Sequence, residues 1–166
     1  MNGKRMAILW IASVALSSVC AGKAPDGNPR VAPNFELPGK ERQVALDDYK
    51  GKIVYLDFWA SWCSPCQASF PWMNAMQEKY GDKGLVVLAV NLDRKKKDAE
   101  AFLEKNPARF IVTFDQEWKT AKEYKVEGMP SAYLIGKDGT VLHTHIGFSK
   151  KNSEKYEENI RKALGI

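Results

Sequence analysis

The chain has 166 residues and a formal net charge of +5, and 45% of its residues are hydrophobic, 11% aromatic and 27% charged. This length and composition suit one globular domain and exclude a disordered tail, a fibre and a multi-span membrane protein. Three cysteines are too few for a disulfide-rich scaffold. The charge is too small to indicate nucleic-acid binding, so we expect no nucleic-acid partner.

The first 21 residues have the build of a secretory signal peptide. Two basic residues are followed by an uncharged, mostly apolar run at 7–19, and small residues favour cleavage after Ala21. The run is shorter than the roughly 20 residues that span a bilayer, although a retained single-span anchor stays an alternative. Lipid attachment at Cys20 is a third option, because residues 16–20 loosely resemble a bacterial lipobox. The leader predicts a periplasmic or other extracytoplasmic protein.

A linker rich in Gly and Pro is expected at 22–33, and a single domain at 34–166 follows it. Nearly continuous apolar runs at 53–59 and 85–90 predict strands that are covered on both faces. Apolar residues at helical spacing between these runs predict a parallel pair of strands joined by a crossover helix.

The second half of the domain continues the alternation of helix and strand. The Lys137-Asp138-Gly139 turn lies between two apolar runs and predicts a hairpin. The last helix is expected to start at Asn152 or Ser153 as its cap. The elements expected here are a helix, a strand, a short helix, two strands and a helix, at 99–103, 110–114, 118–124, 132–135, 141–146 and 156–164. We therefore expect an α/β domain with a mixed sheet and helices on both faces.

Cys63 and Cys66 form a C-x-x-C pair between a predicted strand and a predicted helix. The free N–H groups and the positive dipole end of a helix start stabilise a thiolate, which is the form that attacks a disulfide. Cys66, one turn further along, is placed to resolve the mixed disulfide. Pro65 suits a first helical turn because its missing N–H would be unpaired there. A zinc site would need a second such pair, and a four-residue ring is a weak structural staple, so redox chemistry is favoured.

Two other positions point to the same chemistry. Asp57 interrupts an apolar strand, and a carboxyl group buried there would have a raised pKa and could exchange a proton with Cys66. The alternative is an aspartate at a solvated strand end. The Met129-Pro130 bond can be cis, and the Met129 backbone could then pair with an extended substrate segment. The alternative is a trans proline at a strand edge.

These motifs resemble the thioredoxin superfamily. Residues 57–66, Asp-Phe-Trp-Ala-Ser-Trp-Cys-Ser-Pro-Cys, are similar to its active-site segment, and residues 126–131 resemble its cis-proline loop. Residues 32–37 and 46–52 resemble the N-terminal extension of the TlpA/ResA-like branch, which also has a central insertion. The resemblance implies a thioredoxin-like fold with both additions. It also implies an extracytoplasmic thiol-disulfide oxidoreductase that uses no cofactor or metal.

The resemblance assigns roles to individual residues. Cys63 corresponds to the nucleophile, Cys66 to the resolving thiol, Asp57 to the buried acid and Pro130 to the cis-proline. The residues expected to contact substrate are Trp62, Ser64, Pro65, Met129 and Pro130.

The sequence departs from the family pattern at two positions. Ser69 stands where many members of the branch have Glu, and Ala89 stands where thioredoxin has a Lys that faces the buried acid. The partners implied are protein disulfides, apocytochrome c among them, and a membrane thiol transporter as electron donor. We expect the protein to be a monomer.

The direction of exchange and the competing functions depend on nearby residues. Ser64-Pro65 supplies no charge to the cysteine pair, which favours a reductant over a dithiol oxidant. A peroxiredoxin is disfavoured, because neither cysteine has a Pro seven residues and a Ser or Thr three residues before it.

A Cu(I)-binding metallochaperone is the alternative that is not an enzyme. Cys63 and Cys66 would hold the ion, with His143 or His145 as a third ligand. These histidines share a face of a predicted strand, and we expect them to be exposed polar residues. Trp118 and Tyr124 are expected in the core, and the basic run at 94–97 in a solvated loop.

Overall fold

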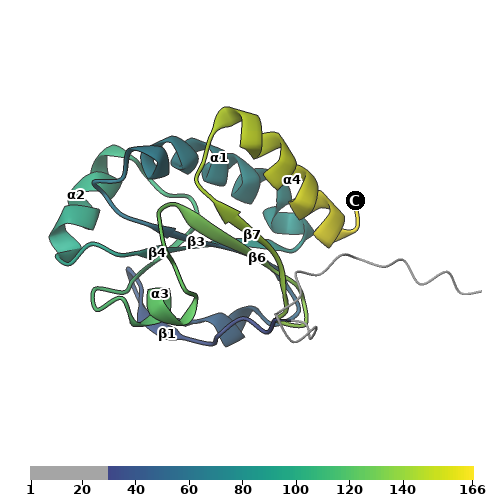
Figure 1. The fold of residues 1–166 in the computed structure, drawn as a ribbon, viewed down its shortest axis with the longest axis horizontal. Helices are drawn as coiled ribbons and strands as arrows, with labels where there is room; N and C mark the ends of the chain where they lie inside the picture. The colour runs from purple at the N-terminus through teal and green to yellow at the C-terminus, as the bar shows by residue number, and fades with distance from the viewer. Residues whose placement is uncertain (1–29) are drawn as a thin grey trace, which may run out of the picture.

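The computed structural model describes residues 30–166, in which a layer of strands lies between two layers that contain helices (Figure 1). The strands of the main sheet are β3 Ile53–Trp59, β4 Leu85–Asn91, β5 Ile111–Phe114, β6 Ser131–Ile135 and β7 Val141–Ile146. Their order in the sheet is β5-β4-β3-β6-β7. The first three strands are parallel and the last two are antiparallel to their neighbours, which confirms the mixed sheet and the hairpin predicted at Lys137-Asp138-Gly139.

The central strand β3 sets the position of the site. All seven of its residues are buried, as expected for a strand with a neighbour on each side and a covered layer on each face. The helix α1, Ser64–Tyr80, connects β3 to the parallel strand β4 as the predicted crossover. Phe58 of β3 lies opposite Ser131 at the start of β6. The end of β3 and the start of β6 therefore lie side by side at one end of the sheet.

Helices cover both faces of the sheet (Figure 1). The remaining helices are α2 Lys96–Lys105, α3 Lys119–Glu123 and α4 Lys150–Leu164. Phe70 of α1, Phe102 of α2 and Ile160 of α4 belong to one cluster of buried side chains on the first face. The opposite face is covered by α3 and by the N-terminal extension.

The N-terminal extension is a short hairpin followed by a helical turn. Its antiparallel strands are β1 Glu36–Pro38 and β2 Gln43–Ala45, and the 3-10 turn η1 covers Leu46–Tyr49. Phe35 packs edge-on against Tyr124, with 6.4 Å between the ring centroids. The extension thus closes the second face of the core.

Residues 30–33, which the sequence assigned to the end of the linker, pack onto the hairpin of β6 and β7. The N–H of Ala32 donates to the carbonyl of Gly139 at 2.9 Å, and the N–H of Val141 donates to the carbonyl of Arg30 at 2.8 Å. The predicted signal peptide, with Cys20, lies outside the described residues. From residue 30 onward, no helix is both long enough and apolar enough to cross a membrane.

Two sequence expectations for the C-terminal part are wrong. The cap of α4 is Ser149, whose Oγ accepts from the N–H of Asn152 at 3.3 Å, so Asn152 and Ser153 lie inside the helix. His145 is also not an exposed strand residue, since only 6% of it is accessible. Its ring stacks on Tyr156 of α4 at 3.9 Å between centroids, so the covering helix buries it.

Candidate functional site

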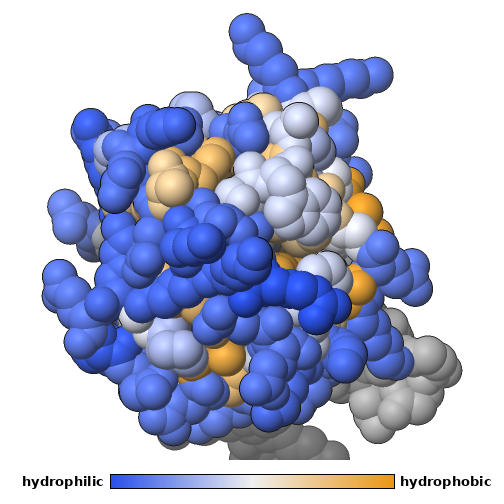
Figure 2. All heavy atoms as spheres, turned by 90° about the vertical axis from the view of Figure 1, so that its left-hand side faces the viewer, coloured by the Kyte–Doolittle hydropathy of each residue, from blue (hydrophilic) through white to orange (hydrophobic). Residues whose placement is uncertain are grey.

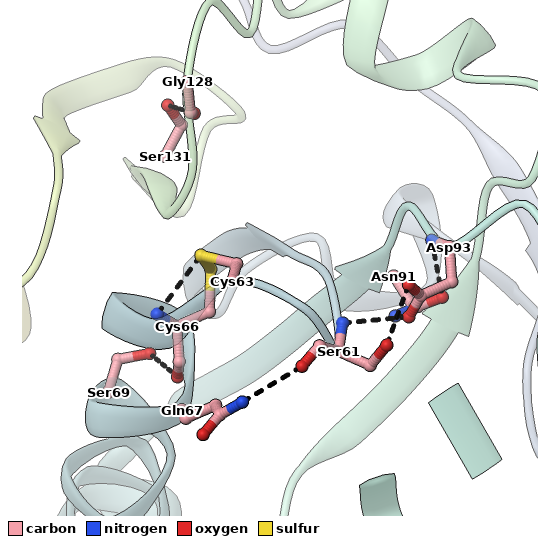
Figure 3. The surroundings of a disulfide bond; sticks show 9 residues. All are labelled: Ser61, Cys63, Cys66, Gln67, Ser69, Asn91, Asp93, Gly128 and Ser131. Atoms are coloured by element: carbon pink, nitrogen blue, oxygen red, sulfur yellow. Dashed lines mark hydrogen bonds between the residues drawn. A yellow bond between two sulfur atoms is a disulfide. The ribbon is translucent and has the colours of Figure 1, made fainter. Parts of the chain in front are cut away.

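Cys63 and Cys66 form a disulfide at the start of α1 (Figure 3). Cys63 is the N-cap of the helix, and its Sγ accepts from the N–H of Cys66 at 3.3 Å. Pro65 lies in the first helical turn, where a missing N–H costs no hydrogen bond. The sequence places this pair correctly, because a strand, a tight turn and a helix start are all encoded within a few residues.

The two sulfur-bearing residues differ in accessibility. Cys66 is fully buried, whereas 6% of Cys63 is exposed, and the neighbouring Trp62 is 65% exposed. Ser64 and Pro65 are also exposed. A reagent from solution therefore reaches Cys63 first, past Trp62.

A buried carboxylate fixes the turn that precedes Cys63 (Figure 3). Asp93, just after β4, accepts from the backbone N–H and the hydroxyl of Ser61, each at 3.0 Å. It also accepts from the side-chain amide of Asn91 at 2.7 Å. Sequence reasoning missed this residue, although an Asn-x-Asp pattern that begins on the last residue of a buried strand is a signal for a polar network at a strand end.

Asp57 is buried in the middle of β3, where little in the surrounding protein offsets the loss of its hydration. It is 2% exposed, and its Oδ2 has no hydrogen-bond partner among residues 30–166. Burial raises the pKa of this carboxyl group well above its ordinary value. Its neighbours in the sheet are Ala89 and Ala132, so no cation faces it from the adjacent strands.

The side chain of Asp57 lies on the face that α1 covers. Side chains alternate along a strand, so Asp57 shares its face with Tyr55 and Trp59. Those two belong to the same buried cluster as Cys66. This agrees with the expectation of an acid on the Cys66 side of the strand.

The loop before β6 faces the disulfide from a separate segment (Figure 3). The Met129-Pro130 peptide bond is cis, as the loop motif predicted. The hydroxyl of Ser131 donates to the carbonyl of Gly128 at 2.7 Å, which braces the loop. The carbonyl of Pro130 accepts from the N–H of Gly147 at 2.8 Å.

A cavity of about 420 Å³ connects the cis-proline loop to the cysteine pair. Trp62 and Cys63 line it from the active-site segment, and Val126 and Met129 line it from the loop. Trp118 is also part of the lining; it is half-buried and packs against one of the buried clusters, so the expectation that it belongs to the core is confirmed only in part. Tyr124, by contrast, is fully buried as expected.

One side of the molecule has a mostly polar surface. Figure 2 shows the side of the molecule that faces left in Figure 1, and the described surface there is mainly hydrophilic with small apolar areas between. Apolar contact with a partner on this side is therefore local.

In the described part of the chain, neither His143 nor His145 belongs to a group of side chains that could hold a metal ion. His143 and His145 share a face of β7, as expected, with 6.2 Å between ring centroids. The Nε2 of His145 is 3.1 Å from the side-chain amide of Asn159. Within residues 30–166, no three or more His, Cys, Asp or Glu side chains come together in a way that could hold a metal ion.

A cysteine pair that caps a helix, opposite a cis-proline loop at the end of a mixed sheet, defines a thioredoxin-like thiol-disulfide oxidoreductase. The chain belongs to the AhpC/TSA family, whose model matches residues 29–144. These findings confirm the predicted superfamily, fold and type of enzyme.

Similar proteins agree with this assignment. The chain is 35% identical over 132 residues to the thiol-disulfide oxidoreductase ResA of Bacillus thuringiensis subsp. konkukian (strain 97-27), covering 79% of this chain and 75% of that protein. A Chlorobium tepidum crystal structure assigned as a thiol:disulfide interchange protein DsbE is 52% identical with a TM-score of 0.82, covering 82% of this chain and 97% of that one. The exposed lipoprotein thioredoxin of Streptococcus pneumoniae strain TIGR4 is 35% identical with a TM-score of 0.65, covering 75% and 97%.

Proposed function

We propose that this enzyme works outside the cytoplasm and reduces disulfide bonds in proteins, apocytochrome c among them. The observation that carries the reductive cycle is the unequal exposure of the two cysteines at the start of α1. Cys63 is accessible to a substrate and Cys66 is buried beneath it. This arrangement suits one sulfur that attacks the substrate disulfide and a second that resolves the mixed disulfide.

In the proposed cycle, the thiolate of Cys63 attacks one sulfur of the substrate disulfide. A mixed disulfide forms, and the other substrate sulfur leaves as a thiolate that takes a proton. The sulfur of Cys66 then attacks Cys63, which breaks the mixed disulfide and releases the second substrate thiol. Two electrons have passed from the dithiol to the substrate, and the enzyme is left with the Cys63–Cys66 disulfide.

Asp57 is proposed as the group that removes the proton from Cys66 during resolution. A carboxylate with a raised pKa is a stronger base than an exposed one, and Asp57 lies on the face of β3 that packs under α1. Met129 and Pro130 are proposed to hold the substrate segment beside Cys63, together with Trp62, Ser64 and Pro65. A membrane thiol transporter is proposed to restore the dithiol, and the working unit is proposed to be a monomer.

The proposed location rests on the leader and on the relatives. The segment at 1–21 has the build of a signal peptide, and one similar protein is described as an exposed lipoprotein. Mass spectrometry of the mature N-terminus separates cleavage after Ala21, lipidation at Cys20 and retention as an anchor. A mature chain that keeps Met1 and stays in the cytoplasmic fraction would refute the proposal of export.

Substrate trapping tests the cycle. A Cys66→Ala variant cannot resolve, so it should accumulate mixed disulfides with its substrates through Cys63, and the double variant with Cys63→Ala should accumulate none. Trapping that persists in the double variant contradicts the assignment. The reduction potential tests the direction: we expect a value nearer the ~−270 mV of thioredoxin than the ~−120 mV of a strong oxidant.

A further inference from the structure

We infer that Trp118 determines substrate specificity. With Trp62 it forms a pocket beside Cys63, and this pocket receives an apolar or aromatic side chain next to the substrate cysteine. Glu127 at the same pocket favours a substrate with a cationic residue close to that side chain. This rests on the proposed function, because the pocket matters only if a polypeptide disulfide is attacked at Cys63.

The pocket is continuous with the reacting sulfur. Cys63 itself is part of the lining of the 420 Å³ cavity, together with Trp62, Trp118, Val126 and Met129. Volumes of 300–1,000 Å³ are typical of sites that enclose a small molecule, so there is room for a large side chain. A chain that presents its disulfide to Cys63 must pass its flanking residues over this cavity.

The indole of Trp118 is held in place before any substrate arrives. Its Nε1 donates to the carbonyl of Leu92 at 2.8 Å. Its backbone has φ 60° and ψ 25°, in the left-handed region that residues other than glycine rarely adopt. The backbone N–H of Trp118 donates to the carbonyl of Asp115 at 3.1 Å. A conformation of this kind persists only where the surroundings fix it, so the wall of the pocket is pre-formed.

One charge accompanies the apolar lining. Glu127 is the single charged residue that lines this cavity in the described structure, and its side chain is exposed. No salt bridge joins it to another residue of the part described. An exposed carboxylate beside an apolar pocket complements a segment in which an apolar residue and a Lys or Arg lie close to the cysteine.

The test uses short peptides that contain one intramolecular disulfide. In each peptide, Phe or Ser is placed next to the reactive cysteine, first on one side and then on the other, and Lys or Asp occupies the position beyond it. Oxidation of the reduced enzyme is followed by tryptophan fluorescence, which gives the second-order rate constant for each peptide. Because each result is a ratio between two peptides, a change in the general reactivity of Cys63 cancels. We expect the wild-type enzyme to prefer Phe over Ser about tenfold, within the range that one side chain in an apolar pocket provides.

Matched variants separate the pocket from the backbone. Trp118→Gly removes the indole and relieves the left-handed conformation, and it should bring the Phe-to-Ser ratio within about twofold of unity. Lys125→Gly is the control, because Lys125 is the other non-glycine residue with positive φ within residues 30–166, at 58°, and is exposed outside the pocket lining. This variant should keep the wild-type ratio.

The charge is tested in the same way. Glu127→Gln should lower the Lys-to-Asp ratio, whereas Glu123→Gln, which removes an exposed carboxylate that does not line this cavity, should keep it. Equal rates for Phe and Ser peptides in the wild type, or a preference that survives Trp118→Gly, overturn the inference while the reductase function stands. If the reduced enzyme reduces none of the peptides, both the inference and the proposed function fail.

Discussion

Replacing Asp57 by Asn tests the buried acid through stability and through rate. In the part of the chain that the structure describes, the carboxyl group is 2% exposed, lacks a hydrogen-bond partner at Oδ2 and has no cation beside it in the sheet, so its pKa is raised by burial. The unfolded chain has the ordinary value of about 3.9. Below that pH the carboxyl group of Asp57 is protonated in both the folded and the unfolded state, so its ionisation takes no stability from the fold.

The pH dependence of stability follows from this difference. As the pH rises, the unfolded state loses its proton first, and stability is lost until the pH passes the folded pKa. Because burial raises the folded pKa of Asp57 well above the unfolded value, the wild type should become progressively less stable as the pH rises from about 4 toward neutrality. Asp57→Asn does not titrate. Its unfolding free energy relative to the wild type should therefore increase as the pH rises above about 4.

Urea unfolding of the two proteins in the disulfide form, from pH 4 to pH 8, measures this difference. The Asn side chain brings unpaired N–H groups of its own, which shift the variant by an amount that does not change with pH. The slope, rather than the offset, is therefore the decisive quantity. Asp82→Asn removes an exposed carboxylate in the turn that follows α1 and is the control. Parallel curves for Asp57→Asn and the wild type would refute the argument from burial.

The rate of resolution tests the chemistry separately. General acid–base catalysis typically contributes 10²–10⁴-fold, so we expect Asp57→Asn to slow release of the substrate from Cys63 about a hundredfold at pH 7. Acid quenching of the mixed disulfide and mass spectrometry measure this step. A normal rate together with the predicted slope in stability would mean that Asp57 is buried but does not move the proton.

Three other predictions concern groups around the site. Burial lowers the pKa of His145 to about 4, so its contribution to stability is complete above about pH 6.5 and falls by up to ~3 kcal/mol as the pH drops to 4; His145→Gln should lose this dependence in urea unfolding. The stability contributed by His145 thus rises with pH, whereas that of Asp57 falls. The two contributions are separated by comparing the wild type with each variant in turn. Ser61→Ala removes one hydrogen bond to the Asp93 carboxylate and should lower the unfolding free energy by about 1–2 kcal/mol, whereas no change would show that the bond is replaced by water. Reduced Cys63 should react with iodoacetamide at mildly acidic pH faster than an ordinary free thiol, and an ordinary rate would contradict stabilisation of its thiolate by the helix start.

The parts of the fold that the sequence predicted are those encoded by neighbouring residues. The apolar run at 53–59 is a buried strand, and the turn at Lys137-Asp138-Gly139 closes a hairpin. The position of Cys63 at the helix start follows from the same strand–turn–helix pattern. Each of these depends on a period or a turn that lies within a few positions of the chain.

The features that the sequence did not predict depend on partners from elsewhere in the chain. His145 lies in a polar stretch typical of an exposed strand, yet it is buried because Tyr156 and Asn159 of α4 pack over it. Trp118 packs against the buried core, as its hydrophobicity suggests, but it also lines the cavity beside Cys63. Its indole is held there by a hydrogen bond to the carbonyl of Leu92, 26 residues away in sequence. Local patterns contain no information about such pairings.

The end of β4 supports both sides of the pocket. Leu92 donates its N–H to the carbonyl of Trp59 at 2.9 Å and accepts from the Trp118 indole at 2.8 Å. The next residue, Asp93, holds Ser61 two positions before Cys63. Two consecutive residues thus fix the segment that carries the nucleophile and the aromatic wall that faces it. Because this support is a buried strand end with paired polar groups, the distance between Cys63 and Trp118 is set by the sheet rather than by the exposed loops around them.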